Sequence, residues 1–145
     1  MVDIITTITI RRPLQEVAVY VANPDYAPEW YENIKSVEWK TDRPLQVGTR
    51  LAFIAHFLGR KLVYEYQVVT YRPGEILVMQ TSQGPFPMQT TYQWNAIDSN
   101  NTSMLLRNTG RPSGFSGLLA PFMSVAMRMA NQKDLKRLKS LLERH

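Results

Sequence analysis

The side chains best suited to chemistry are three tyrosines and an asparagine in stretches of strand-like alternation. Tyr64, Tyr66, Tyr92 and Asn108 share parity with large apolar neighbours, so we expect them to face the interior. A buried hydroxyl without a hydrogen-bond partner costs about 1–3 kcal/mol. As a set, these groups exceed what a dry core needs, and a bound ligand or trapped water would supply their partners. Their chemistry would be the shaping of a substrate and hydrogen bonding to it.

The predicted cavity wall also takes apolar side chains of the same parity and two methionines from a C-terminal helix. Taken singly, each of these side chains also fits a hydrophobic core, so the prediction depends on the set. The expected ligand-binding residues are Trp30, Leu51, Phe53, Phe57, Tyr64, Tyr66, Tyr92, Trp94, Met104, Leu106, Asn108, Met123 and Met127.

Acid–base and metal chemistry have few candidates. His145 is the terminal residue, while His56 and Glu65 fall on outward parity in their strands. The sequence shows no His/Asp/Glu cluster of the kind a metal needs, no cysteine, no phosphate-binding glycine loop and no nucleophile elbow. We therefore expect neither a metal nor a nucleotide cofactor, and we assign no catalytic residue.

Composition fits one globular domain spanning residues 1–145. Hydrophobic residues make up 44% and charged residues 20% of the chain. No apolar run reaches the ~18 residues of a membrane span, and the first residues do not resemble a signal peptide, so we expect a cytoplasmic protein. The net charge of +5 fits an anionic partner or a basic helix face. We favour the helix face, because no nucleic-acid motif accompanies the charge.

The pattern along the chain predicts an α+β protein. A strand over 3–10 is followed by a helix opened by Pro13 and ended by Asn23-Pro24. A short helical turn or tight loop is expected over 25–31, with aromatic side chains that pack over the core or form a lid or wall of a pocket. Strands are expected over 34–40, 49–58, 61–71, 76–82, 86–97 and 102–109, with a tight turn at Gly59-Arg60. Short connections make the sheet of about seven strands mostly antiparallel. Because such a sheet needs cover, the long helix predicted after Pro121 should lie across it.

That helix has two distinct faces. Met123, Met127, Leu135, Leu138, Leu141 and Leu142 form an apolar stripe that should pack on the sheet. Lys133, Lys136, Lys139 and Arg144 lie on a solvated face. Phe122, Val125 and Met129 also lie away from the stripe. We expect neighbouring segments to cover them; if exposed, they would form a patch suited to a dimer contact or a membrane surface.

Several short motifs resemble those of a known superfamily. They are Arg12-Pro13-Leu14-Gln15-Glu16-Val17, Val21-Ala22-Asn23-Pro24 with Trp30, Val47-Gly48-Thr49-Arg50, Leu58-Gly59-Arg60-Lys61 and Tyr71-Arg72-Pro73. Their order resembles the START-like (SRPBCC) superfamily over nearly the whole chain, and most closely its polyketide cyclase/dehydrase-like branch. The resemblance implies a helix-grip fold, in which a curved sheet wraps around the C-terminal helix. It also implies a deep apolar cavity for hydrophobic or aromatic small molecules.

Three functional hypotheses follow. The first is binding, and possible transport or sequestration, of an aromatic or isoprenoid-like molecule. The second is a cyclase- or dehydratase-like enzyme that uses Tyr64, Tyr66, Tyr92 or Asn108 without a metal or nucleotide. The third is a non-catalytic partner protein acting through Phe122, Val125 and Met129. Peripheral membrane contact and a monomer or weak homodimer are compatible with the first hypothesis, whereas nucleic-acid binding is not expected.

Overall fold

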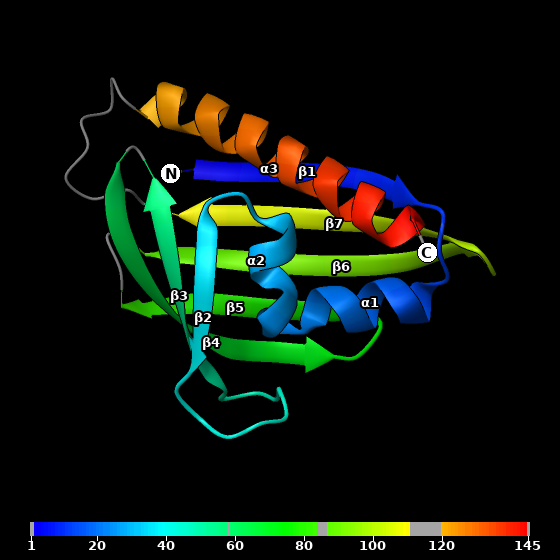
Figure 1. The fold of residues 1–145 in the computed structure, drawn as a ribbon, viewed down its shortest axis with the longest axis horizontal. Helices are drawn as coiled ribbons and strands as arrows, with labels where there is room; N and C mark the ends of the chain where they lie inside the picture. The colour runs from blue at the N-terminus through cyan, green and yellow to red at the C-terminus, as the bar shows by residue number, and fades with distance from the viewer. Residues whose placement is uncertain (1, 58, 84–86, 111–119, 145) are drawn as a thin grey trace.

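The computed structural model describes residues 2–57, 59–83, 87–110 and 120–144. The elements in chain order are β1 (Val2–Ile10), α1 (Leu14–Ala22), the 3-10 helix η1 (Pro24–Tyr26), α2 (Ala27–Trp30), β2 (Ile34–Trp39), β3 (Arg50–Phe57), β4 (Arg60–Arg72), β5 (Ile76–Gln83), β6 (Met88–Asp98), β7 (Asn101–Gly110) and α3 (Ala120–Glu143). Figure 1 shows the sheet with α3 along one edge and α1 and α2 across the same face.

The sheet has seven strands in the order β1-β7-β6-β5-β4-β3-β2, and every neighbouring pair is antiparallel. This confirms the predicted α+β helix-grip architecture and its strand number. The β3–β4 turn was placed one residue too late, because Arg60 already pairs with Phe57. Gly59 keeps a φ of +75°, the left-handed region that glycine adopts without strain.

Alternating burial shows which face of the sheet is covered. In β1, Ile4 and Ile10 are fully buried while Ile5 is exposed. In β7, Met104 and Leu106 are fully buried, and Asn108 continues the same parity. The inward orientation predicted from the alternation of apolar residues is therefore confirmed for these strands.

The first helix follows a period of 3.6 residues. Val17, Ala18, Val21 and Ala22 are its buried residues. Pro13 precedes the helix as its N-cap rather than opening it, so the predicted boundary was one residue early. Asn23 ends α1, and its side chain accepts a hydrogen bond from the backbone N–H of Asp25 at 3.0 Å, which starts η1.

The long helix α3 is held at its C-terminal half. Leu135 and Leu138 are 1% and 0% exposed and belong to the core. Glu143 accepts hydrogen bonds from the backbone N–H of Arg11 at 2.8 Å and from Lys139 at 2.6 Å. These contacts fix the end of α3 against the segment that follows β1. Within the described residues, no helix is long and apolar enough to cross a membrane.

The first half of α3 departs from expectation. Val125 and Met129 are 53% and 66% exposed, so the prediction that neighbouring segments cover them is wrong. They lie opposite the stripe that packs on the core, at positions that helical geometry turns away from the sheet. The side chain of Phe122 lies outside the part that the structure describes.

Candidate functional site

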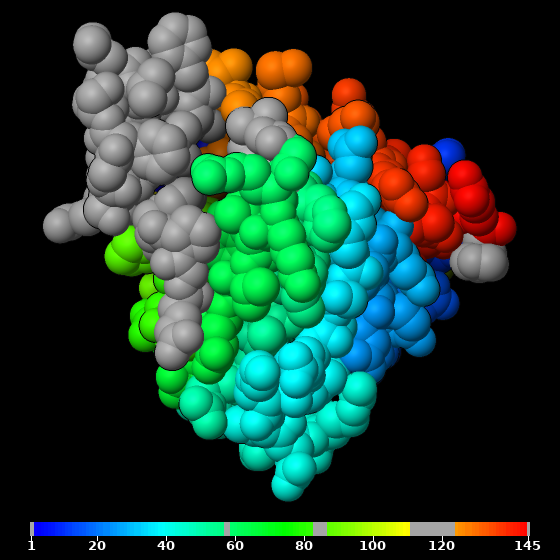
Figure 2. All heavy atoms as spheres, turned by 60° about the vertical axis from the view of Figure 1, so that its left-hand side comes forward, coloured from blue at the N-terminus to red at the C-terminus, as the bar shows by residue number. Residues whose placement is uncertain are grey.

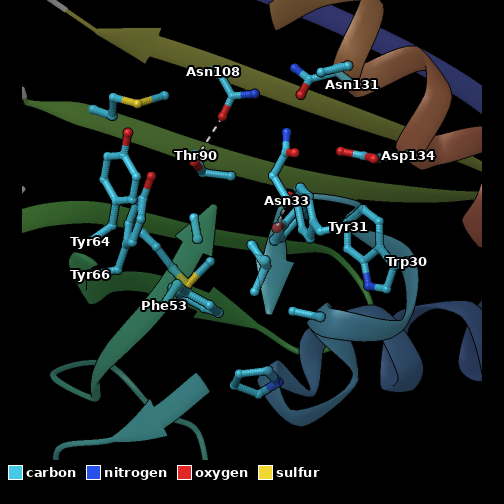
Figure 3. A pocket seen from close by; sticks show the side chains of 18 of the residues that line it. Trp30, Tyr31, Asn33, Phe53, Tyr64, Tyr66, Thr90, Asn108, Asn131 and Asp134 are labelled. Atoms are coloured by element: carbon cyan, nitrogen blue, oxygen red, sulfur yellow. Dashed lines mark hydrogen bonds between the residues drawn. The ribbon is translucent and has the colours of Figure 1, made fainter. Parts of the chain in front are cut away.

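A cavity of about 650 Å³ lies between the concave face of the sheet and α3. Its wall is built by α1, η1, α2, β2 to β7 and the middle of α3. Apolar side chains make up most of this wall, with polar groups gathered in two places (Figure 3). Arg60 and Ala126 are the exposed members of the lining, so the cavity opens between the β3–β4 hairpin and the first half of α3.

Seven of the predicted ligand-binding residues line this cavity. They are Trp30, Phe53, Tyr64, Tyr66, Tyr92, Asn108 and Met127. They come from α2, β3, β4, β6, β7 and α3. The fold thus brings these side chains to one place, although a ligand-binding role for them stays a prediction.

Four predicted wall residues lie elsewhere, in the continuous core cluster. Leu51, Trp94, Met104 and Leu106 are at most 2% exposed and are not part of the cavity wall. Strand parity indicates which face of the sheet a side chain occupies, but not how far along the strand a cavity extends. The helix α1 packs directly on β6 and β7. Figure 1 shows it across the part of these strands that leads to the β6–β7 turn. The side chains of Phe57 and Met123 lie outside the described residues.

One polar group of the cavity spans β6 and β7. Thr90 and Asn108 are partners in the strand register, and the Thr90 hydroxyl donates a hydrogen bond to Oδ1 of Asn108 at 2.9 Å. Both residues are buried. Burial raises the pKa of the nearby Tyr66 to about 12, an effect that Thr90 partly opposes. Tyr66 therefore remains a neutral hydrogen-bond donor near neutral pH.

The second polar group is centred on Asp134 of α3. This carboxylate is 5% exposed, and its Oδ1 accepts the backbone N–H of Glu32 at 3.1 Å. Burial raises its pKa to about 6; the bond from Glu32 and the charges of Lys133 and Arg137 oppose this rise. Asn131, one turn earlier, has an amide nitrogen with no hydrogen-bond partner among the described residues. Figure 3 shows Asn131 and Asp134 on the α3 side of the cavity.

A pair of phenols belongs to the same end of the cavity. The hydroxyl oxygens of Tyr31 and Tyr92 are 2.5 Å apart, so one donates to the other. Because each phenol carries one proton, the accepting hydroxyl keeps its own proton for a further bond. Burial raises the pKa of both groups, and the charge of Asp134 adds to the rise. The cavity therefore places a carboxylate that can take up a proton near pH 6 beside phenols that stay protonated.

The expected ligand-binding residues leave out Tyr31, Asn33, Thr90, Asn131 and Asp134, all of which line the cavity. Thr90 shares the parity of Tyr92 along its strand, which predicts the same inward direction, but it was not among the expected ligand-binding residues. Asn131 and Asp134 stand four and seven residues after Met127, which is the spacing of one helix face. Because both residues are polar, a search for an apolar stripe on α3 leaves them out. Their helical spacing from Met127 was the only sequence signal that they face the cavity.

The loop between β2 and β3 forms part of the cavity wall. Leu45 of this loop and Pro24 of η1 both line it. Asp25 fastens the loop, because its carboxylate accepts hydrogen bonds from Trp39 Nε1 at 2.9 Å and from Arg43. The Arg43 guanidinium also lies 4.4 Å from the centre of the Trp39 ring, a cation–π distance. We name Asp25, Trp39 and Arg43 the loop clasp.

Two acid–base side chains that the sequence places on outward parity, His56 and Glu65, lie outside the cavity. His56 is exposed and Glu65 pairs with Arg50 at 3.8 Å, on the face away from the cavity. Among the residues that the structure describes, no three His, Asp or Glu side chains are close enough to hold a metal ion.

Comparison with known proteins agrees with this architecture. The structure is similar to a START superfamily protein from Mycobacterium smegmatis, with a TM-score of 0.85 and 13% identity over 98% of this chain and 97% of that one. It is also similar to the Zhui aromatase/cyclase from Streptomyces sp. R1128, with a TM-score of 0.82 and 14% identity over 98% and 93% of the two chains. At these identities the likeness establishes the fold alone.

The sequence supplies the family. No curated protein matches the chain. The family described as "Polyketide cyclase / dehydrase and lipid transport" matches residues 1–143, nearly the full length. Together with the seven-stranded sheet and the helix that it holds, this match agrees with the START-like resemblance of the motifs. The chain therefore belongs to the polyketide cyclase/dehydrase and lipid transport family of START-like proteins.

Proposed function

We propose that the protein binds one hydrophobic, aromatic or isoprenoid-like small molecule in the cavity between sheet and α3. The observation that carries this proposal is the cavity of about 650 Å³ with its largely apolar wall. Cavities of roughly 300–1,000 Å³ with a few convergent polar groups are typical sites for drug-sized ligands. Transport or sequestration of such a molecule would need no further chemistry.

The polar groups suggest how the ligand lies. Ala126 borders the opening, and Asp134 follows eight residues later on α3, about 12 Å along the helix axis. A molecule of two or three fused rings spans this distance. Its apolar body would lie against Phe53 and Tyr64, while a hydroxyl or carbonyl group would reach the polar end. There Asp134 offers an acceptor, and the Tyr31–Tyr92 pair offers a donor.

A ligand panel tests this proposal. Flavonoids, quinones and fatty acids are titrated into the purified protein while tryptophan fluorescence is followed, because Trp30 lines the cavity. We expect saturable quenching by at least one ring-containing compound. The variant Ala130→Phe places a ring in the cavity lining and should abolish it. Ser140→Phe is the matched control, since Ser140 is exposed on the outer face of α3. Flat responses to the whole panel would refute the proposal.

A cyclase- or dehydratase-like reaction is the second candidate, and Asp134 is the observation that favours it. A carboxylate with a pKa of about 6 can remove a proton from the carbon beside a ligand carbonyl at neutral pH. The enolate oxygen so formed would accept a hydrogen bond from the Tyr31–Tyr92 pair. In a dehydration, the protonated Asp134 would return its proton to the departing hydroxyl, which leaves as water. Similarity to an aromatase/cyclase supports this direction.

Turnover separates the two candidates. An enzyme of this kind should convert a β-hydroxy or β-dicarbonyl aromatic precursor, with a rate that rises through pH 6 as Asp134 ionises. Asp134→Asn should remove turnover while ligand binding persists. A rate that Asp134→Asn leaves unchanged would exclude this mechanism. We further propose that the protein is cytoplasmic. We also propose that it is a monomer or a weak homodimer, and sedimentation velocity at increasing concentration would test this oligomeric state.

A further inference from the structure

The opening of the cavity is bordered by a surface that combines exposed apolar and basic side chains. Val125, Met129, Lys133 and Lys136 follow one another at helical spacing on the outer face of α3, and all are exposed. The β3–β4 hairpin adds the exposed Arg60, which belongs to the cavity lining. We name this surface the mouth face and define it as Arg60, Val125, Met129, Lys133 and Lys136.

The view in Figure 2 brings these elements together on one side of the molecule. The first half of α3, in orange, lies above the green β3–β4 hairpin. Arg60 and Ala126 from these two elements belong to the cavity lining, so the mouth face surrounds the route by which a ligand enters. Its two apolar side chains stand nearest the opening, whereas the lysines follow along α3.

The charge of this surface has one sign. Between residues 124 and 142 the only acidic residue is Asp134, and it is buried. In the segment between α2 and β2, the exposed carboxylate of Glu32 pairs with Lys133 at 3.1 Å. The three basic residues of the mouth face therefore exceed their described acidic neighbour by two charges, counted from Arg60, Lys133 and Lys136 against Glu32. Such a surface complements an anionic one.

We propose that the mouth face docks on an anionic lipid bilayer, from which the cavity takes up its apolar ligand. Lysines contact lipid phosphates while Val125 and Met129 enter the headgroup boundary, as exposed faces of interfacial helices do. The uptake clause depends on the proposed ligand-binding function, whereas docking stands without it. A second copy of the chain fits this face less well, because it would bring the same positive charges. Nucleic acid would complement the lysines but leave the apolar pair exposed to water.

The contact is small, so binding should be reversible and dependent on lipid charge. Two apolar side chains cannot anchor a protein alone, and each basic residue near an anionic membrane strengthens binding about fivefold. The ligand-free full-length protein is mixed with phosphatidylcholine vesicles, or with vesicles that also contain phosphatidylglycerol, and sedimented. We expect binding to the second kind only, and a steep loss of binding with added salt.

Variants identify the surface that binds. Lys136→Gln should weaken vesicle binding about fivefold, and Met129→Gln should weaken it several-fold. Matched controls are Arg72→Gln at the end of β4 and Val19→Gln on α1, both exposed and absent from the cavity lining. Each control variant should change vesicle binding only slightly. None of these four residues belongs to the cavity wall, so ligand titration in vesicle-free solution should be unchanged.

Several results would overturn the proposal. Vesicle binding that is absent, insensitive to phosphatidylglycerol, or weakened equally by the control variants would each contradict it. A fall in solution mass caused by Met129→Gln would instead assign the face to a dimer. Binding of a DNA oligomer without vesicle binding would assign it to nucleic acid. If the ligand panel fails while vesicle binding behaves as expected, docking stands and only the uptake clause is lost.

Discussion

Replacing Asp134 with asparagine should make the protein more stable at neutral pH. Asp134 is 5% exposed on the buried face of α3, and burial raises its pKa from 3.8 to about 6. The folded state therefore holds a proton on this group more tightly than the unfolded chain does. As pH rises from about 4 to about 6, the unfolded chain ionises first, and the free energy of unfolding falls. Above that range the full cost of the buried charge is present.

The magnitude follows from the two pKa values. The difference between 3.8 and about 6 corresponds to about 3 kcal/mol of destabilisation at pH 7. Asparagine carries no charge, and its oxygen can still accept the backbone N–H of Glu32. Its amide hydrogens need partners, however, which lowers the net gain to about 1–3 kcal/mol. For a chain of this length, the gain would raise the Tm by roughly 3–10 °C.

Urea unfolding followed by circular dichroism at several pH values measures this effect. The gain from Asp134→Asn should be present at pH 7 and should vanish well below pH 3.8, where both states of the wild type bind the proton. Asp42→Asn is the control, because Asp42 is exposed in the β2–β3 loop. A variant that is less stable than the wild type at pH 7, or a gain that does not change with pH, would refute the reasoning.

Three further changes probe the supports of the cavity. Burial opposes ionisation of Glu143, but hydrogen bonds from the backbone after β1 and from Lys139 hold its pKa at about 2. Glu143→Gln should therefore cost about 1–2 kcal/mol at pH 7, and urea unfolding should show this loss vanish as pH falls from about 4.5 towards 2. Asp25→Asn should loosen the loop clasp by weakening the ion pair with Arg43. Faster amide hydrogen exchange over residues 41–48, with under about 1 kcal/mol of global change, would show this; unchanged exchange would count against the clasp. Leu138→Ala should cost about 2–5 kcal/mol, because Leu138 is fully buried. That loss should be equal at pH 4 and pH 7, and a smaller loss would mean that α3 packs loosely on the sheet.

The sequence was sufficient for the fold because its signals are local. Alternation in β6 and β7, with prolines and glycines between strands, predicts a hairpin-connected sheet with one covered face. Only that face could receive a long terminal helix whose apolar residues recur at helical spacing. Boundary errors of one residue, as at Pro13 and Gly59, arise where cap and turn geometry depend on backbone angles that residue types do not determine.

The cavity was less predictable because its limits depend on packing at a distance. Trp94 and Tyr92 share parity in one strand and both belong to the core cluster, yet only Tyr92 also lines the cavity. What separates them is the position of α1, which no local pattern in β6 encodes. Tyr31 was not among the expected ligand-binding residues for a similar reason: it ends a four-residue helix, where no period indicates its direction. Its contact with Tyr92 joins residues 61 positions apart in the sequence.

The placement of Asp134 connects stability with function. A stripe that serves only packing would gain by carrying leucine or asparagine there, since the buried carboxylate costs about 3 kcal/mol at neutral pH. Asn131, whose amide nitrogen lacks a partner within the described chain, adds to that cost one turn away. Both side chains border the cavity, and Leu135 and Leu138, which follow them on α3, are buried in the core. Destabilising polar groups concentrated where the helix meets an open volume are what a ligand with a complementary polar group would compensate. The stability gained by Asp134→Asn and the turnover it loses should therefore arise from the same buried charge.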